Sequence, residues 1–279
     1  MRRSRRNWAT GAPGELPAVD LDLTKPSIAR VYDYLLGGRE HFDVDRRAAI
    51  AILNAVPETT QLAKENRQFL QRGVRYLVAE AGIRQLIDIG SGLPSAGNVH
   101  EVAHMIDPMV RVVYVDNDPM VLAHARALLA TDERSVSITA DIREPDTIFD
   151  HPDTRELIDF DQPYAVLLGG VLHHLHDHED PFGVAARIRA RMGAGCYLLV
   201  SNFLGGDDPR SDSLEYAFLE GGLGYGRFRT WDEQQRYFEG LELVEPGLVY
   251  ANDWRPDEET PSDSPVRKLL AAGIGRKSG

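Results

Sequence analysis

The sequence predicts an α/β fold: a mostly parallel sheet with an antiparallel last strand, preceded by a helical N-terminal extension. Three observations lead to this prediction. From Gly82 onward, short apolar runs alternate with helical segments, which is the pattern of a parallel sheet with right-handed crossovers. Two of these runs end in an aspartate, at Asp88 and Asp116. No strand candidate precedes Gly82, and a hydrophobic content of 43% over 279 residues supports a large core.

The N-terminal part divides into a lead-in and a set of helices. Residues 1–22 are rich in Arg, Gly and Pro and are predicted to be disordered. Helical spacing of apolar side chains predicts helices over Ser27–Leu36, His41–Leu53 and Gln61–Ala79. We therefore expect a helical cap over residues 23–81 and a ligand-binding α/β domain over residues 82–279.

The α/β part follows in order. Strands are predicted at Gln85–Ile89, Arg111–Val115, Ser135–Ala140, Tyr164–Gly169 and Cys196–Ser201. Helices are predicted at Asn98–Ile106, Met120–Leu129, Phe182–Arg191 and Trp231–Phe238. Two strand pieces, Leu241–Glu245 and Leu248–Tyr250, surround a Pro-Gly turn, and Lys268–Ile274 is predicted as an antiparallel edge strand.

The first strand runs into a turn with glycine at alternate positions, Gly90 and Gly92. A tight turn whose backbone touches a ligand needs glycine, since a Cβ would block both the turn and the ligand. Ser95 stands where the third glycine of the dinucleotide fingerprint belongs. The carboxylate of Asp88 repels a diphosphate but attracts an ammonium group, and S-adenosylmethionine (SAM) carries an ammonium and no phosphate. The turn therefore favours SAM over NAD.

The second strand supplies an acid at the distance expected for a nucleoside site. Asp116 is placed to accept hydrogen bonds from ribose hydroxyls, with Asn117 beside it. An aspartate at a strand end is alternatively a helix N-cap or a turn residue. For Asp118, which precedes Pro119 and a helical run, we favour the N-cap interpretation.

A longer series of motifs occurs in a fixed order along the chain. The segments are Pro26–Gly38, Asp45-Arg46, Glu65–Arg67, Arg72–Leu77, Asp88–Pro94, Asn98–Glu101, Val113–Pro119, Asp141–Pro145, Leu172-His173 and Gly240–Gly247. Together they resemble a bacterial family of S-adenosyl methyltransferases of unresolved substrate, common in actinomycetes. Ser91 stands where threonine is more usual in that family. The resemblance implies a class I methyltransferase: a Rossmann-like, SAM-binding sheet with a helical N-terminal extension.

The resemblance also implies roles for individual residues of a SAM site. The backbone at Gly90, Ser91 and Gly92 approaches the methionine part, with Asp88 nearby. Asp141 and Ile142 hold the adenine, and the segment Gly169–His173 closes the pocket.

The cap is expected to contribute to the same site. Tyr34 and the turn at Gly37-Gly38 are candidates to lie over the cofactor, whereas Tyr32 is assigned to the core. Arg67 and Arg72 are candidate partners for the SAM carboxylate, with a solvated helix face as the alternative.

Four histidines crowd one predicted loop, at positions 173, 174, 176 and 178, with Asp177 among them. His173 is our candidate general base, and a polar loop at the sheet edge is the alternative. A metal site is the rival interpretation. The spacing does not match the H-x-H-x-D-H pattern of metallo-hydrolases, so we predict no metal. The glycine-rich stretch Gly205–Arg229 is expected to be either a lid over the acceptor or an ordinary flexible loop.

Composition limits the partners. A net charge of −12 repels polyanions, which argues against nucleic acid as the substrate. No apolar run has the length of a membrane span, and the single cysteine, Cys196, fits a reducing cytoplasm. We expect a cytoplasmic SAM-dependent methyltransferase acting on a small-molecule acceptor. A SAM-binding sensor without catalysis is the alternative, and the oligomeric state stays open, with a homodimer among the choices.

Overall fold

The computed structural model describes residues 22, 24–94, 97–129, 132–223 and 226–279. The predicted lead-in lies outside the described residues, apart from Asp22. The helices are α1 (Ile28–Leu35), α2 (Asp43–Ala55), α3 (Thr59–Ala79), α4 (Val99–His104), α5 (Pro119–Leu128), α6 (Pro145–Phe149), α7 (Pro152–Leu157), α8 (Pro181–Arg191), α9 (Arg210–Glu220) and α10 (Trp231–Gln235). Single helical turns also occur, including η1 (Leu172–His174), η2 (Asp177–Glu179) and η3 (Arg236–Phe238).

Eight strands form one sheet in the order β3-β2-β1-β4-β5-β8-β6, and β7 also pairs with β8. The strands are β1 (Gln85–Ile89), β2 (Arg111–Asp116), β3 (Ser135–Thr139), β4 (Ala165–Gly169), β5 (Tyr197–Phe203), β6 (Glu242–Leu243), β7 (Val249–Tyr250) and β8 (Leu270–Arg276). Strands β1 to β5 are parallel, and β8 runs antiparallel to β5. The predicted antiparallel last strand is confirmed. It is not the bare edge that we expected, because β6 and β7 pair with its outer side.

Alternate side chains of each strand face opposite layers, as strand geometry requires. Leu86, Leu167 and Leu199 belong to one core cluster with the apolar side of α3. Their neighbours along the strands belong to a second cluster on the other face of the sheet, with α6 and α8. Helix α3 lies directly on the sheet, because a Cβ at Gly73 would stand 2.2 Å from Cδ1 of Leu199. Residues 23–81 thus include a helix of the sheet layers, and a boundary at residue 82 stays a prediction.

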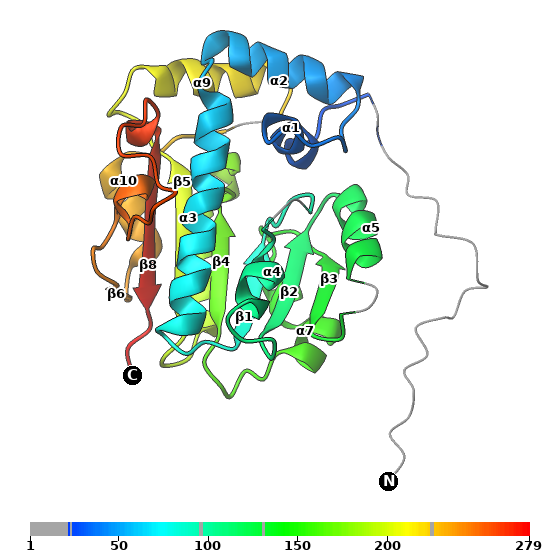
Figure 1. Ribbon diagram of the computed structural model, residues 1–279, viewed down its shortest axis with the longest axis vertical. Coiled ribbons are helices and arrows are strands. Elements are labelled where there is room, and N and C mark those ends of the chain that lie inside the picture. The colour runs from blue at the N-terminus through cyan, green and yellow to red at the C-terminus, as the bar shows by residue number, and fades with distance from the viewer. Residues whose placement is uncertain (1–21, 23, 95–96, 130–131, 224–225) are drawn as a thin grey trace, which may run out of the picture.

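Three helices, α1, α2 and α9, lie across the end of the molecule at which the parallel strands finish (Figure 1). Helix α1 is tied to the start of α5, because the hydroxyl of Ser27 donates a hydrogen bond to the carboxylate of Asp118. Nε of Arg30 and Oδ2 of Asp45 form a buried ion pair at 2.9 Å. Ala29 and Phe42 also pack on a small apolar cluster that includes Leu93, just beyond the glycine turn. The cap is therefore fastened beside the predicted ligand site.

The stretch Gly205–Arg229 contains a helix that the sequence analysis did not predict. Helix α9 buries Leu214 and Phe218, and it packs against α2. The many glycines on either side of this helix concealed the apolar spacing of its buried positions. Residues 224–225, inside the same stretch, lie outside the described residues.

Gly205→Ala should lower the free energy of unfolding by about 1–3 kcal/mol, the usual cost of overpacking. A Cβ at this position would stand 2.6 Å from the carbonyl oxygen of Phe228, and a backbone atom cannot rotate away. Urea unfolding measures the change. Gly193→Ala is the matched control, because a Cβ there has no atom within 4 Å. Equal stability of the two variants would contradict the packing described here.

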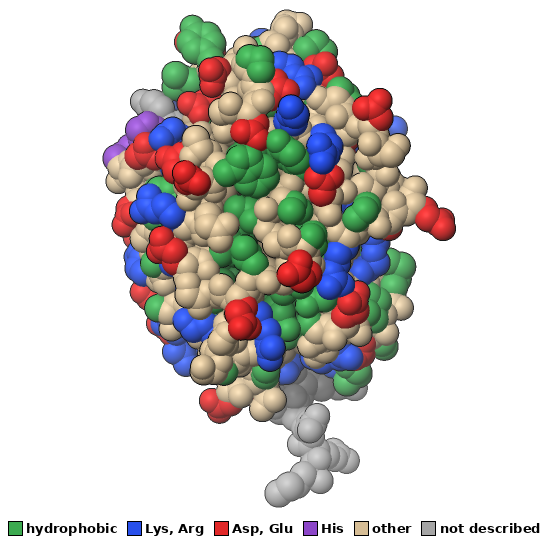
Figure 2. Space-filling model, turned by 90° about the vertical axis from the view of Figure 1, so that its left-hand side faces the viewer, with side chains coloured by type: hydrophobic (Ala, Val, Ile, Leu, Met, Phe, Trp, Pro, Cys, Tyr) green, Lys and Arg blue, Asp and Glu red, His purple; other side chains and the backbone are tan. Residues whose placement is uncertain are grey.

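No helix among the described residues is long and apolar enough to cross a membrane. On the face that Figure 2 presents, acidic and basic side chains are interspersed around a patch of apolar ones.

Candidate active site

The carboxyl ends of β1 and β4 meet at the centre of the sheet, where the order of the strands reverses. Ligands of open α/β sheets bind at such a switch point. The turn after β1 is held in place because the amides of Gly90 and Ser91 donate to the carbonyl of Val115, at 2.8 and 3.1 Å. Gly90 and Gly92 have φ of +74° and +67°, which side chains rarely adopt. A Cβ at Gly90 would collide with Val171, whereas one at Gly92 would point into open space.

Asp116 holds the glycine turn as well as ending β2. Its Oδ2 accepts a hydrogen bond from the amide of Gly92, and its Oδ1 accepts one from the amide of Asp118, both at 2.9 Å. Burial raises the pKa of Asp116. Asp118 is the N-cap of α5, as predicted, because its carboxylate accepts from the amide of Met120 at 2.8 Å.

A cleft with an empty volume of about 400 Å³, open solvent included, lies beside this turn. Among the predicted site residues, Arg67, Asp88, Ser91 and Gly92 line it. Asp88 is 4% exposed, and its pKa rises to about 7 because burial outweighs the attraction of Arg67. Nη2 of Arg67 donates to Oδ1 of Asn98 at 3.1 Å, whereas its Nε is buried without a hydrogen-bond partner in the described part of the chain. The cleft therefore pairs one carboxyl group with one incompletely satisfied cation.

The predicted adenine residues lie at the next strand end. Nδ2 of Asn117 approaches Oδ2 of Asp141 at 3.5 Å. The carboxylate of Asp141 is paired with the guanidinium of Arg143 at 2.5 Å, which lowers the pKa of Asp141. Arg143 also contacts Glu179 at 2.7 Å. Ile142 is 9% exposed and packs in the core. Gly169 ends β4 and lies beside Leu70, which lines the cleft next to the glycine turn.

Two predicted residues of the cap, Tyr34 and Gly38, line neither this cleft nor the second cleft described below. Tyr34 packs edge-on against His41, with ring centroids 5.0 Å apart. A Cβ at Gly38 would overlap the carboxylate of Asp33, which accounts for the glycine by local packing. Their placement over the cofactor stays a prediction.

The solvated helix face that we gave as the alternative for Arg72 was wrong, and Arg72 lines neither of the two clefts, so its pairing with the SAM carboxylate stays a prediction. Arg72 is 4% exposed, and its guanidinium donates to the carbonyls of Ala251, at 2.6 Å, and Trp254, at 3.1 Å. It anchors the C-terminal segment to α3, a contact between residues far apart in sequence that no local motif announces.

A second cleft, with an empty volume of about 410 Å³, lies between the cap and the ends of β4 and β5. Its lining consists of Ile28, Val31, Tyr32, Leu35, Thr59, Ala63, Asn66, Gly170, His173, His174, Phe203, Phe218 and Leu223. Helix α3 lines both clefts: Asn66 contributes to the second cleft and Arg67 to the first. Tyr32, which we assigned to the core, packs on the core and also lines this cleft.

His173 lies in the wall of the second cleft. It is 3% exposed, and its ring stacks on Phe203 with centroids 4.2 Å apart. The amide of Phe203 approaches its Nδ1 at 3.5 Å. Burial lowers the pKa of His173 well below its ordinary value, so the imidazole is neutral at physiological pH.

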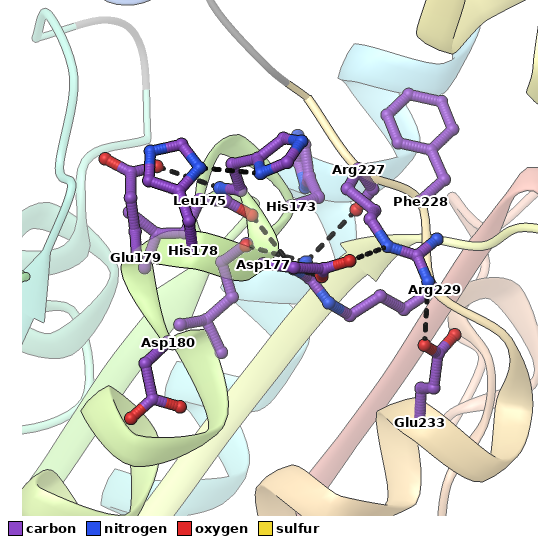
Figure 3. A network of polar contacts seen from close by, with 12 residues as sticks. His173, Leu175, Asp177, His178, Glu179, Asp180, Arg227, Phe228, Arg229 and Glu233 are labelled. Carbon is purple, nitrogen blue, oxygen red and sulfur yellow. Dashed lines mark hydrogen bonds and ion pairs between the residues drawn. The ribbon is translucent and has the colours of Figure 1, made fainter.

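The histidine-rich loop divides into two parts that face different surroundings. His173 and His174 line the second cleft, whereas Nδ1 atoms of His176 and His178 lie 2.8 Å apart on the outer side. No group of three or more potential metal ligands occurs among the described residues. The loop is held by Asp177, which pairs with Arg227 at 2.7 Å and Arg229 at 3.0 Å (Figure 3).

Several cleft residues escaped the sequence analysis. Asn66 lay inside a quoted motif and His174 in the histidine-rich loop, each without a role of its own in the site, and Phe203 and Phe218 were not singled out. A glycine at 170 was the available signal: its φ is +78°, and a Cβ there would stand 2.9 Å from Nδ2 of Asn66.

This chain is similar to known proteins both in sequence and in fold. The family model described as S-adenosyl methyltransferase matches residues 15–278. A crystal structure from Thermobifida fusca, described as a candidate methyltransferase, is 47% identical, with a TM-score of 0.88 over 92% of this chain and 97% of that one. A DUF574 family protein from Streptomyces avermitilis is 34% identical, with a TM-score of 0.87 over 92% of this chain and 99% of that one.

A more distant likeness concerns the fold alone. An O-methyltransferase family protein from Burkholderia thailandensis is 16% identical, with a TM-score of 0.52 over 88% of this chain and 64% of that one. No curated protein sequence matches this chain. The match along almost the whole sequence, together with the glycine turn and the acids around it, is decisive. The chain belongs to the S-adenosyl methyltransferase family and is a SAM-dependent methyltransferase of the class I fold.

Proposed function

We propose that this methyltransferase holds SAM at the first cleft and transfers the methyl group to a small-molecule acceptor. The observation that carries the proposal is that Asp88 and Arg67 line the same cleft, beside the open glycine turn. The amino-acid end of SAM has an ammonium and a carboxylate. A cleft with one carboxyl group and one guanidinium matches that zwitterion group by group.

The residues of the first cleft fit SAM on two further observations. Gly92 leaves open space where a side chain would stand, so a ligand has room against the backbone. Nε of Arg67 is buried without a partner, and a carboxylate there would satisfy it. The ammonium group of SAM would give Asp88 an opposite charge, which would offset the cost of burying its ionised carboxylate.

Asp116 and Asn117 would bind the ribose hydroxyls, and Asp141 with Ile142 would hold the adenine. Asp116 supports this role because it fixes the amide of Gly92 at 2.9 Å, so one carboxylate organises both the turn and the sugar. The carboxylate of Asp141 is shared with Arg143, which would fix its direction. Gly169 lies at the end of β4 and would close the SAM site on the side of that strand.

SAM supplies a methyl group already activated on a sulfonium, so the protein chiefly supplies alignment and a dry site. His173 would contribute to the acceptor side of that site. Its Nδ1 faces the amide of Phe203, so the ring would carry its proton on Nε2. Nε2 would then donate a hydrogen bond to the molecule that receives the methyl group.

Calorimetry with SAM, S-adenosylhomocysteine and NAD tests the proposal. The two sulfur compounds should bind and NAD should not. Arg67→Gln should weaken SAM binding about tenfold, since a charge-assisted hydrogen bond to the carboxylate is lost. Arg75→Gln is the matched control, because Arg75 lies on the same helix and pairs with Asp257 at 2.5 Å, outside both clefts. Equal affinities in the two variants, or tighter binding of NAD, would contradict this assignment.

A further inference from the structure

The second cleft contains five polar side chains, and four of them have a protein partner. The hydroxyl of Tyr32 donates to the carbonyl of Ala63 at 2.8 Å and accepts from Nδ2 of Asn66 at 3.1 Å. Oδ1 of Asn66 accepts from the hydroxyl of Ser201 at 2.6 Å. The hydroxyl of Thr59 donates to the carbonyl of Val56 at 2.7 Å.

The remaining polar groups are the two histidines. Nδ1 of His173 faces the amide of Phe203, as described above. The imidazole of His174 forms no hydrogen bond or ion pair with any part of the chain that the structure describes, and its ring lies beside those of His173, at 4.2 Å, and Phe218, at 5.8 Å. Burial lowers the pKa of His174 to about 4, so this imidazole is neutral and keeps a lone pair for a ligand.

The rest of the lining is apolar and aromatic. Phe203 and Phe218 lie 6.0 Å apart between ring centroids, and aliphatic side chains of α1 line the same cleft. No Lys, Arg, Asp or Glu belongs to the described lining. A charged ligand would therefore lose its hydration without gaining an opposite charge.

The position of the second cleft relates it to the first. Asn66 and Arg67 are consecutive on α3 and face the second and the first cleft respectively. Glycine at 170 keeps side-chain atoms out of the space beside Asn66. A molecule in the second cleft would thus lie next to one in the first.

We infer that the second cleft is the acceptor site and that it takes a neutral, flat, largely apolar molecule with one hydrogen-bond donor, such as a phenol, which His174 binds through a ring nitrogen. This inference rests on the proposed function, since it makes the cleft a neighbour of the SAM site. The cleft favours a ligand with a donor because the neutral ring of His174 lines it with an acceptor nitrogen that has no hydrogen-bond partner in the described chain. Aromatic rings on the walls favour a flat ligand.

Three naphthalene probes test the inference by calorimetry, with the protein saturated by S-adenosylhomocysteine. 1-Naphthol offers a donor, 1-methoxynaphthalene lacks it, and 1-naphthoate carries a negative charge. Wild-type protein should bind 1-naphthol about fivefold to tenfold more tightly than the other two. His174→Phe should remove this preference and leave the affinity for 1-methoxynaphthalene unchanged, since one hydrogen bond is lost and the ring shape is kept.

The matched control is His178→Phe, the same substitution at an exposed position of the same loop, which should behave as wild type. The ring nitrogens of His174 provide a second readout, because their NMR signals should move when 1-naphthol is added to labelled wild-type protein. An unchanged preference for 1-naphthol in His174→Phe, or tighter binding of 1-naphthoate, would overturn the inference. Failure of S-adenosylhomocysteine to bind would overturn the proposed function, whereas its binding without any binding of 1-naphthol would overturn only this inference.

Discussion

Replacing Asp88 by asparagine should raise the free energy of unfolding of the ligand-free protein at pH 8 by about 4 kcal/mol, while weakening SAM binding at least tenfold. The pKa of Asp88 rises from 3.8 to about 7 on folding, so its ionised form is disfavoured in the native state. Asparagine keeps the shape of the side chain and removes the charge. The ligand-free site would become more stable and less able to bind an ammonium group.

The sign of the effect follows from proton binding. Between pH 3.8 and about 7 the folded protein holds a proton on Asp88 that the unfolded chain has released. Stability contributed by this group therefore falls as the pH rises through that window. Wild type and Asp88→Asn should be about equally stable near pH 4 and should diverge by pH 8.

Urea unfolding at a series of pH values between 4 and 8 would measure this divergence. Asp161→Asn is the control, because it removes the same charge from an exposed loop. Parallel pH profiles for wild type and Asp88→Asn would contradict the buried, proton-binding state of Asp88. Gained stability without any loss of SAM affinity would contradict its role in the cofactor site.

Asp116→Ala should lower the affinity for SAM and S-adenosylhomocysteine by about 1–3 kcal/mol, or roughly fivefold to 150-fold. The variant loses the proposed acceptor for the ribose hydroxyls. It also leaves the amides of Gly92 and Asp118 without the carboxylate that they contact at 2.9 Å. Asp116→Asn, which can still accept from one of these amides, should show a smaller loss.

Calorimetry on both variants would give these affinities, and circular dichroism would show whether each variant is folded. Asp161→Asn again serves as the surface control. A folded Asp116→Ala protein with wild-type affinity would remove Asp116 from the ribose site.

The sequence analysis succeeded where the determining interactions are local. Apolar runs predicted β1 to β5 to within two residues at either end, because strand spacing and the flanking turns are read from neighbouring residues. The alternate glycines predicted a turn that is now seen at positive φ. The N-cap role of Asp118 followed from the proline after it.

The sequence analysis failed where the residues that contact one another lie far apart along the chain. Arg72 contacts carbonyls about 180 residues away, at Ala251 and Trp254, and no spacing rule reports such a pairing. Helix α9 was overlooked because its short apolar face becomes evident only where it packs against α2.

The sequence by itself determined the fold class, the family and the cluster of Asp88, Gly90 and Gly92 at one strand end, because each depends on short patterns and on the shared direction of parallel strands. The tertiary structure decided which charged groups meet. It placed Arg67 opposite Asp88 and separated His174 from His178, although all four residues were visible in the sequence. The physical reason is that burial and pairing depend on the packing of α3 and the cap over the sheet, and that packing brings together segments that no local pattern connects.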